Sequence, residues 1–518
     1  MDQAWWYSLV LLFFFLLAST KLFLLKQTPV NHLPPSPFAL PIIGHLHLIK
    51  GSLHRTLSSL SNKYGPVLHL QFGFRTVFVI TSPSAVEECF TKNDIIFANR
   101  PRLLSGKHLN YDYTTIGAAS YGHHWRNLRR FTALQIFSMN CLNKSSLIRQ
   151  DEIRLLLGKL FKDAQHGFAK VELKSRFSEL AFNIIIRMVA GKRYYGDDLE
   201  DLEEASQFRD IISENFELSG ASNPGDFVPF LQWIDYYGLE RRMLTLKAKT
   251  DTFLQSLIDE CRCSRESNSS CSLQSGNSTL QEETKTTMID VMLSLQETEP
   301  ENYTDTTIKG IILILLIAGT DTTSVTIEWA MSLLLNHQEV LKKAKAELHT
   351  NVGHDRLMDE SDLPRLPYLQ GIINETLRLF PAVPLLSPHE SSDDCTIGEF
   401  DVPKGTVLII NAWAIHRDPK LWEDPNSFKP ERFGEMGGEA KKWLIPFGLG
   451  RRGCPGSGLA NRVVGLALGT LIQCFEWERV SEEEVDMTEG AGLSMPKAKP
   501  LEAMCKAHQA MIYTLSGL

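Results

Sequence analysis

The apolar residues of this chain recur mostly at the three- and four-residue spacing of helices that bury one face. This pattern predicts helices over residues 84–91, 125–136, 177–189, 239–261, 308–336, 338–351 and 368–380. Alternating runs on both sides of Gly73, within residues 67–80, predict a β-hairpin, and strand-like alternation returns over residues 397–410. The expected fold class is therefore mainly α with small β-sheets.

The first apolar run differs from the others, because residues 3–20 are rich in Leu, Phe and Trp and contain no charge. Continued to residue 25, with Lys21 reaching back to the interface, it would form about 34 Å of helix at about 1.5 Å per residue. Residues 1–25 are therefore predicted to be a membrane anchor. A cleaved signal peptide is the alternative, but no basic segment precedes the run. Asp2 precedes it and Lys26, Lys50 and Arg55 follow, which predicts that the remainder lies in the cytosol.

Three segments follow the anchor. Residues 26–40 are Pro-rich and predict a stiff hinge. Residues 41–518 are interpreted as one globular domain. Within it, residues 261–287 have almost no apolar side chains, which predicts a disordered loop. Cys261, Cys263 and Cys271 lie in that stretch without a neighbouring histidine, so they are interpreted as part of a solvated loop and not as a zinc site.

The helix predicted over residues 308–336 is apolar on all sides, and its length alone would allow a second membrane span. Lys309, Asp321 and Glu328 interrupt the uncharged run, so a buried core helix is expected. Ala318 and Gly319 leave room for a ligand. Thr322 is expected to bond to its own backbone and bend the helix. A core helix with an ordinary small-residue contact is the alternative.

One cysteine lies in a Gly-rich loop, PFGLGRRGCPG over residues 446–456, just before an apolar helical run. The loop glycines permit a close approach to a flat ligand. A helix that starts behind the loop would direct its N–H groups and positive dipole end at the Cys454 sulfur, and both favour the thiolate. The alternative is that Cys454 is a small buried hydrophobe, as most lone cysteines are.

The spacing Phe447-x-x-Gly450-x-Arg452-x-Cys454-x-Gly456 resembles the haem-binding loop of the cytochrome P-450 family at every defined position. The resemblance implies the cytochrome P-450 fold and a haem b cofactor, iron protoporphyrin IX, that is held against Phe447, Gly450 and Gly456. In that family the cysteine, here Cys454, is the axial ligand of the haem iron.

Residues 318–323, AGTDTT, are similar to the oxygen-binding helix of the same family. There the acid and the first threonine, here Asp321 and Thr322, deliver protons through ordered water. Glu375 and Arg378 lie three residues apart on a predicted helix, a spacing that is common in surface pairs. In the family, the arginine at the position of Arg432 joins them in a buried network that supports the haem loop.

The resemblance also implies groups that hold the haem propionates. Trp125, Arg129, His389 and Arg452 fall at the family's positions for these contacts, and arginine suits the task because its planar fork meets a carboxylate. For His389 an exposed surface histidine is the alternative. By family position, the pocket is expected to be lined by residues 102–115, 208–218, 313–322, 382–387 and 490–494. Leu313, Ile317, Val383, Leu385 and Leu386 predict an apolar pocket.

The composition of the chain limits the classes of molecule that it is expected to bind and the compartment in which it is expected to lie. A net charge of −8 argues against nonspecific nucleic-acid binding, and 9 cysteines without a pairing pattern fit a reducing compartment. The resemblance implies electrons from an NADPH-dependent cytochrome P-450 reductase and an endoplasmic reticulum membrane. Docking of the reductase near the cysteine loop is expected through local positive charge, contributed by Arg126, Arg130, Lys441, Lys442 and Arg451.

The whole chain looks like the plant microsomal members of the family, a group that contains isoflavone hydroxylases and methylenedioxy-bridge-forming lignan enzymes. The expected activity is insertion of one oxygen atom from O2 into a hydrophobic plant phenolic or terpenoid. One alternative is a haem-thiolate enzyme that couples phenols, closes a ring or rearranges its substrate without inserting oxygen. Another is a membrane-anchored haem-binding carrier or receptor.

Overall fold

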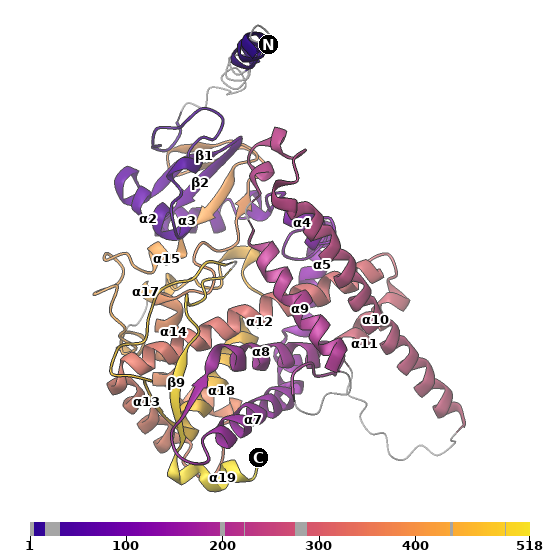
Figure 1. The fold of residues 1–518 in the computed structure, drawn as a ribbon, viewed down its shortest axis with the longest axis vertical. Coiled ribbons are helices and arrows are strands. Elements are labelled where there is room, and N and C mark those ends of the chain that lie inside the picture. The colour runs from indigo at the N-terminus through magenta and orange to yellow at the C-terminus, as the bar shows by residue number, and fades with distance from the viewer. Residues whose placement is uncertain are drawn as a thin grey trace.

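The computed structural model describes residues 5–15, 32–196, 202–221, 223–274, 287–435, 439–492 and 494–518. As predicted, it is mainly helical with small sheets (Figure 1). The helices after the N-terminal region are α2 (Leu53–Tyr64), α3 (Pro83–Phe90), α4 (Leu104–Leu109), α5 (His123–Phe131), α6 (Met139–Lys144), α7 (Ser146–Asp163), α8 (Leu173–Ala190), α9 (Leu202–Ser219), α10 (Leu239–Gln274), α11 (Met288–Thr298), α12 (Asp305–Asn336), α13 (Gln338–Asn351), α14 (Pro367–Leu379), α15 (Ala412–Ile415), α16 (Arg432–Glu435), α17 (Glu439–Lys442), α18 (Ser457–Cys474) and α19 (Ile512–Ser516).

The predicted hairpin is confirmed as β1 (Val67–Phe72) and β2 (Arg75–Ile80), which turn at Gly73 with a φ of 57°. They belong to a four-stranded sheet of order β1-β2-β7-β4, with β4 at His389–Glu390 and β7 at Val407–Ile410. The pair β5 (Cys395–Ile397) and β6 (Phe400–Val402) forms a second sheet. A third sheet, β3-β9-β8, joins Ala169–Glu172, Glu502–Ala507 and Phe475–Glu478, and the apolar pattern did not predict it.

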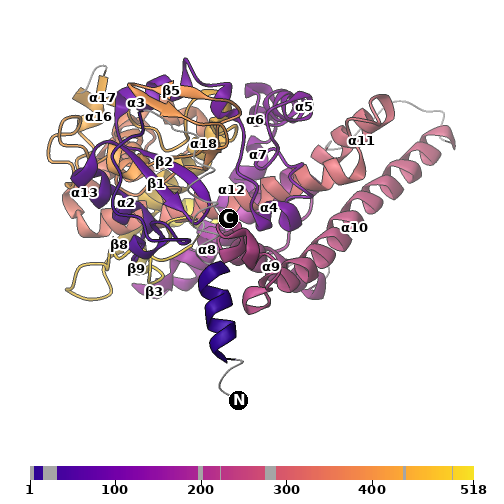
Figure 2. The same ribbon diagram turned by 90° about the horizontal axis from the view of Figure 1, so that it is seen from above.

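Helix α12 forms the centre of the core, where it packs against α8, α14 and α18 (Figures 1 and 2). Ile312, Leu316 and Trp329 are fully buried, and the Trp329 ring stacks on Phe380 with 4.0 Å between centroids. Within the described ranges, α12 is the one helix long and apolar enough to cross a membrane, but 72% of its most apolar window is buried in the protein. The expectation of a core helix is confirmed.

The helix α7 was not predicted, because its apolar pattern is interrupted by buried charges. Arg149 and Glu152 are almost fully buried within it. Arg149 pairs with Glu360, and Glu152 accepts hydrogen bonds from Arg187 and, at 2.7 Å, from Arg193. Buried ion pairs therefore replace apolar contacts on this face, and hydrophobic spacing alone does not register them.

The predicted loop over residues 261–287 is wrong in its first part, because α10 continues through Cys261 to Gln274. This extension is held by polar contacts with α11 and with the start of α12, which substitute for the burial of apolar side chains. Arg262 pairs with Asp305 at 2.6 Å, and the Cys261 thiol donates to Asp290 Oδ1 at 2.9 Å. Residues 275–286 of the predicted loop lie outside the described ranges. No cluster of three or more potential metal ligands occurs among the residues that the structure describes.

The predicted anchor is only partly described. Trp5–Phe15 is a short apolar helix whose large apolar side chains are exposed. That length does not span a bilayer by itself, and residues 1–4 and 16–25 lie outside the described ranges. In the predicted hinge, residues 32–40 are described, and the Pro35 carbonyl accepts a hydrogen bond from His69 N–H in β1 at 3.0 Å. This part of the hinge therefore lies against the first sheet.

Glu375, Arg378 and Arg432 meet in a buried network, as their positions led us to expect. Glu375 pairs with Arg378 at 2.7 Å and with Arg432 at 3.0 Å. Arg378 also donates to the carbonyl of His416 at 2.7 Å. The imidazole Nε2 of His416 in turn accepts the backbone N–H of Ile445 at 3.0 Å, directly before the cysteine loop. The network thus connects α14 to the chain that enters the loop.

Replacing Glu375 by Gln is expected to destabilise the protein by about 3–5 kcal/mol, because two buried guanidinium groups lose their carboxylate. Denaturant unfolding checks this value. Lys343→Ala is the matched control, since it removes an exposed ion pair with Glu431 near the same helix and is expected to leave the unfolding midpoint unchanged. Equal effects of the two substitutions would show that the network does not carry this part of the fold.

Candidate active site

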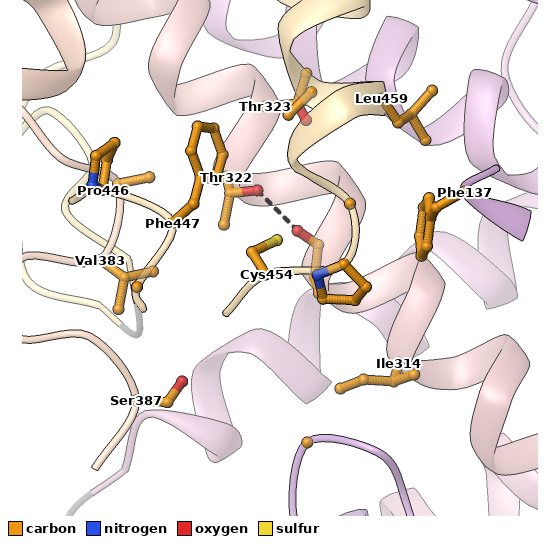
Figure 3. A pocket seen from close by; sticks show the side chains of 18 of the residues that line it. Phe137, Ile314, Thr322, Thr323, Val383, Ser387, Pro446, Phe447, Cys454 and Leu459 are labelled. Carbon is orange, nitrogen blue, oxygen red and sulfur yellow. Dashed lines mark hydrogen bonds between the residues drawn. The ribbon is translucent and has the colours of Figure 1, made fainter. Parts of the chain in front are cut away.

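One cavity of about 350 Å³ lies between α12, α8 and the cysteine loop. Its walls are mainly apolar, with Ile184 and Ile185 from α8, Ile314 and Ala318 from α12, and Val383 and Leu386 from the segment after α14. Figure 3 shows Cys454 and Thr322 at this space, with Val383 and Ile314 around it. The expectation of an apolar pocket is met.

The cysteine loop depends on glycine at two positions. Gly448 and Gly450 have φ values of 70° and 64°, in the left-handed region that side chains disfavour. A Cβ atom on Gly450 would lie 2.5 Å from Asp94 Oδ1. The loop closes with a hydrogen bond of 2.8 Å from Cys454 N–H to the Phe447 carbonyl. Its shape therefore requires Gly450 for both backbone and space.

The Cys454 side chain is accessible, but from the cavity and not from the outer surface, since it lies among cavity-lining residues. Burial raises the pKa of the Cys454 thiol above its usual value, while backbone N–H groups of Gly456 and Ser457 and the charge of Arg129 oppose that rise. The start of α18 favours the thiolate as expected, but burial outweighs it. A bound metal ion would deprotonate such a thiol.

Three guanidinium groups line the same cavity, from Arg100, Arg129 and Arg452. Burial lowers the pKa of Arg452 to about 9, and repulsion from the other two guanidinium groups contributes. Burial also lowers the pKa of Arg100 to about 10. In the described chain none of the three pairs with a carboxylate, and the buried Nε of Arg100 has no hydrogen-bond partner. The cavity therefore carries positive charge that the described chain does not balance.

The structure places Trp125 and His389 at the cavity, each with one hydrogen bond to a backbone carbonyl already formed. The indole N–H of Trp125, its one donor, bonds to the Ile116 carbonyl at 3.1 Å. His389 is buried, so the alternative of an exposed histidine is wrong. Its Nδ1 lies 2.6 Å from the Phe97 carbonyl and must donate to it, and burial lowers the pKa of the imidazole to about 3. The ring is therefore neutral, and its Nε2 is an acceptor.

The predicted acid and alcohol on α12 face different ways. Thr322 lines the cavity, and its hydroxyl donates to the Ala318 carbonyl at 2.8 Å, the backbone bond that was expected (Figure 3). Asp321 does not line the cavity, and its carboxylate accepts a hydrogen bond from Ser494. Burial raises the pKa of Asp321, opposed by that bond and by Lys174.

Two of the five expected lining segments reach the cavity in the structure. Residues 313–322 and 382–387 contribute side chains, whereas none of the described residues in 102–115, 208–218 and 490–494 does. Phe208 instead stacks on Phe253 with 3.8 Å between ring centroids, inside the helical core. Leu313 and Ile317 are buried in that core, and Leu385 packs against the first sheet. Helix α8, which was in none of the expected segments, contributes Ala181, Ile184 and Ile185 to the lining.

Sequence reasoning missed two residues of this site. Arg100 belongs to no motif, and the apolar run over residues 95–98 is the only sign in the sequence that its surroundings are buried. Asp94 accepts the Arg451 side chain at 2.8 Å and its backbone N–H at 3.2 Å. Asp94 thereby ties the cysteine loop to the segment after α3.

The residues of the cavity fit a flat, apolar ring system that bears carboxylates. A thiol reaches into an apolar space, and three guanidinium groups lie along it without carboxylate partners in the described chain. This helical fold and single-thiol site define the class of haem-thiolate proteins.

The chain belongs to the cytochrome P-450 family, whose model matches residues 34–502. It is 54% identical over 509 residues to isoflavone 3'-hydroxylase of Medicago truncatula, covering 97% of this chain and 98% of the relative. It is 53% identical over 488 residues to (+)-piperitol/(+)-sesamin synthase of Sesamum radiatum, covering 94% and 93%. A zebra fish cytochrome P-450 with progesterone superposes with a TM-score of 0.73 at 26% identity, covering 88% of this chain and all of that one. The protein is therefore a cytochrome P-450 monooxygenase, and its cofactor is haem b.

Substitution of Gly450 by Ala is expected to distort the cysteine loop and lower the haem content of the purified protein. The left-handed φ costs about 1–2 kcal/mol with a side chain present, and the contact with Asp94 adds to that cost. Gly51→Ala is the matched control, because Gly51 has a φ of 63° but open space around it. Haem absorbance per protein measures the outcome. Equal haem content in both variants would contradict the proposed close packing of the loop.

Proposed function

We propose that the enzyme inserts one oxygen atom from O2 into a neutral phenolic substrate of flavonoid or lignan size. The single observation that carries the substrate class is the agreement between two relatives that cover nearly the whole chain, isoflavone 3'-hydroxylase and (+)-piperitol/(+)-sesamin synthase. The walls away from the arginines support the proposal, since they combine aliphatic side chains with the hydroxyls of Thr322 and Ser387. Such a surface suits an apolar ring system with few polar substituents.

The chain contributes binding and proton handling, and the haem supplies oxygen chemistry when it is bound. Cys454 would hold the iron through its thiolate. Arg100, Arg129 and Arg452 would neutralise the two propionates, and Phe447, Gly450 and Gly456 would shape the face of the loop against the ring. Neutral His389 presents an acceptor at Nε2, so it would bond to a propionate only if one partner carries a proton. Trp125 would pack against the ring, because its indole N–H could reach a propionate only if its hydrogen bond to the Ile116 carbonyl were broken.

Asp321 and Thr322 would move protons into the cavity. The Thr322 hydroxyl already lies at the cavity wall, so it could bond to water there as an acceptor while it donates to Ala318. Asp321 is partly exposed, and it directly precedes Thr322 without lining the cavity itself. A carboxylate in that position can take a proton from solvent water and pass it to water inside.

The second candidate reaction is oxidative ring closure without oxygen insertion. The observation that favours this reaction is the similarity of the chain to (+)-piperitol/(+)-sesamin synthase. It differs from the main proposal in where the atoms of O2 finish, because ring closure leaves both of them in water.

Reconstituted enzyme supplied with reductase, NADPH and 18O2 is expected to convert an isoflavone or lignan to a product that carries one 18O atom. Binding spectra against phenolics and terpenoids select the substrate, and mass spectrometry reads the label. Cys454→Ala is expected to abolish turnover, and Cys141→Ala serves as control, because Cys141 lies on α6 away from the cavity lining. A ring-closed product without label would favour the second candidate, and tight binding of terpenoids alone would overturn the substrate class.

We also propose that residues 1–25 anchor the enzyme in the endoplasmic reticulum membrane and that a reductase docks beside the cysteine loop. The exposed apolar helix Trp5–Phe15 supports the anchor. For docking, Arg126, Arg130 and Lys441 are exposed, and α5 and α17 lie along one edge of the molecule in Figure 2. Lys442 and Arg451 are less available, since they pair with Glu87 at 2.6 Å and Asp94 at 2.8 Å.

Changing Arg126, Arg130 and Lys441 together to Gln is expected to slow haem reduction by the reductase by about tenfold at low salt. The salt dependence of the rate is also expected to flatten, because less charge steers the encounter. Stopped-flow reduction measures both effects. Lys107, Lys249 and Lys342, exposed on α4, α10 and α13, provide the charge-matched control when all three are changed to Gln. If the control slows reduction equally, only net charge matters and the docking surface is wrong.

A further inference from the structure

The Asp321 carboxylate is held by a segment far away in the sequence. Ser494 Oγ donates a hydrogen bond to Asp321 Oδ2. Ser494 is buried, with 8% of its surface exposed, and precedes the third sheet's strand β9. Its position lies in the segment 490–494 that was expected to line the pocket. The structure instead directs its side chain to Asp321, in the one hydrogen bond to that carboxylate in the described chain.

The contact belongs to a longer attachment between α12 and residues 494–501. The indole N–H of Trp329 donates to the Met495 carbonyl at 2.8 Å, and Leu501 N–H donates to Glu328 Oε1 at 2.9 Å. Asp321 and Glu328 are seven residues apart, so both lie on one face of the helix. Three contacts with α12, from Asp321, Glu328 and Trp329, therefore fix the segment, and Ser494 is not free to move away from Asp321 on its own.

The same segment also reaches the cavity wall. Met495 N–H donates to the Ala382 carbonyl at 2.8 Å, and Ala382 lines the cavity. Ser494 thus lies between the acid on one side and a wall of the substrate space on the other. Position 321 of α12 faces this segment, whereas Thr322, one residue further on, faces the cavity, and the hydrogen bond from Ser494 fixes the Asp321 carboxylate at the segment.

We propose that Ser494 is a positioning residue that holds the Asp321 carboxylate ionised and fixed at the outer side of α12 between proton transfers. The inference rests on the proposed function, because it specifies how Asp321 is prepared for the proton transfer assigned to it there. Ser494 itself does not touch the substrate space. Its hydroxyl acts only through the carboxylate that it holds.

The surrounding charges agree with this role. Burial raises the pKa of Asp321, and the hydrogen bond from Ser494 and the charge of Lys174 on α8 oppose that rise. On α12 itself the nearest acid in the same face is Glu328, whose pKa burial also raises. From the segment, Lys497 lies 4.8 Å from the Trp329 ring centroid and lowers the pKa of Glu328. Loss of the Ser494 hydroxyl removes a donor to the ionised form, so the pKa of Asp321 rises further.

The test is a pH titration of Ser494→Ala against Ser494→Thr in the full-length, haem-loaded enzyme. Infrared difference spectra between acid and neutral pH report the protonated carboxyl of Asp321, identified as the band that Asp321→Asn lacks. Ser494→Ala is expected to move the midpoint of this band to higher pH, and Ser494→Thr, which keeps the hydroxyl, to leave it in place. The yield of product per NADPH consumed is expected to fall as the pH drops and Asp321 becomes protonated. In Ser494→Ala alone, this fall is expected to begin at a higher pH.

Ser332→Ala is the matched control, because Ser332 is a buried hydroxyl on α12 that bonds only to the Glu328 carbonyl of its own helix. It is expected to change neither the midpoint nor the pH at which the product yield begins to fall. An unchanged infrared midpoint in Ser494→Ala overturns the inference, and so does a loss of thermal stability without any shift. If Asp321→Asn couples NADPH to product like the parent enzyme at every pH, the proton role in the proposed function fails, while the infrared midpoint still decides the role of Ser494.

Discussion

The charge balance of two groups of arginines, one around Glu375 and one along the cavity, governs how this molecule is built. Around Glu375, two guanidinium groups are buried with a carboxylate and with backbone carbonyls, and the chain leading to the cysteine loop is bonded to this cluster through His416. Along the cavity, three half-buried guanidinium groups have no carboxylate partner in the described chain. The first cluster is complete in the protein, and in the proposed function the haem propionates would complete the second. On that proposal, assembly of the site would be coupled to binding of an anionic ring.

Helix α12 divides its residues between two tasks. Its buried faces pack against α8, α14 and α18, and at one turn the positions 318, 319 and 322 form cavity wall while 321 turns toward residues 494–501. A single residue step on a helix rotates the side chain by about 100°. Adjacent positions in the AGTDTT motif can therefore serve the cavity and the outer segment at the same time.

Much of the fold could be predicted from sequence, where apolar spacing and local structure agree. Helix α13 begins and ends at the predicted residues, and the β1–β2 hairpin turns at the predicted glycine. Prediction failed where charges replace apolar contacts, as for Arg149 and Glu152 in α7 and for the C-terminal part of α10. It also failed for the third sheet, whose strands come from residues 169–172, 475–478 and 502–507, since pairing at such separation has no local signal.

The site was predictable where spacing in a motif identifies a residue, as for Cys454 and Thr322 at the cavity. Orientation was less predictable, because it depends on partners from distant segments. Asp321 turns toward Ser494, Trp125 gives its donor to Ile116, and Arg100 joins the cavity without any motif. Each of these depends on a contact that forms only when the whole chain is folded.

The close approach of α8 to α12 makes the shape of the substrate space a property of two positions at once. A Cβ atom on Gly319 would lie 2.9 Å from Cδ1 of Ile185, and both residues line the cavity. The obstructing atom is the end of a flexible side chain, so a methyl group at position 319 would be accommodated by rotating Ile185 into or out of the cavity. A substitution at this glycine would therefore change the shape of the cavity through Ile185, and a designer who alters one of the two positions has to choose the other with it.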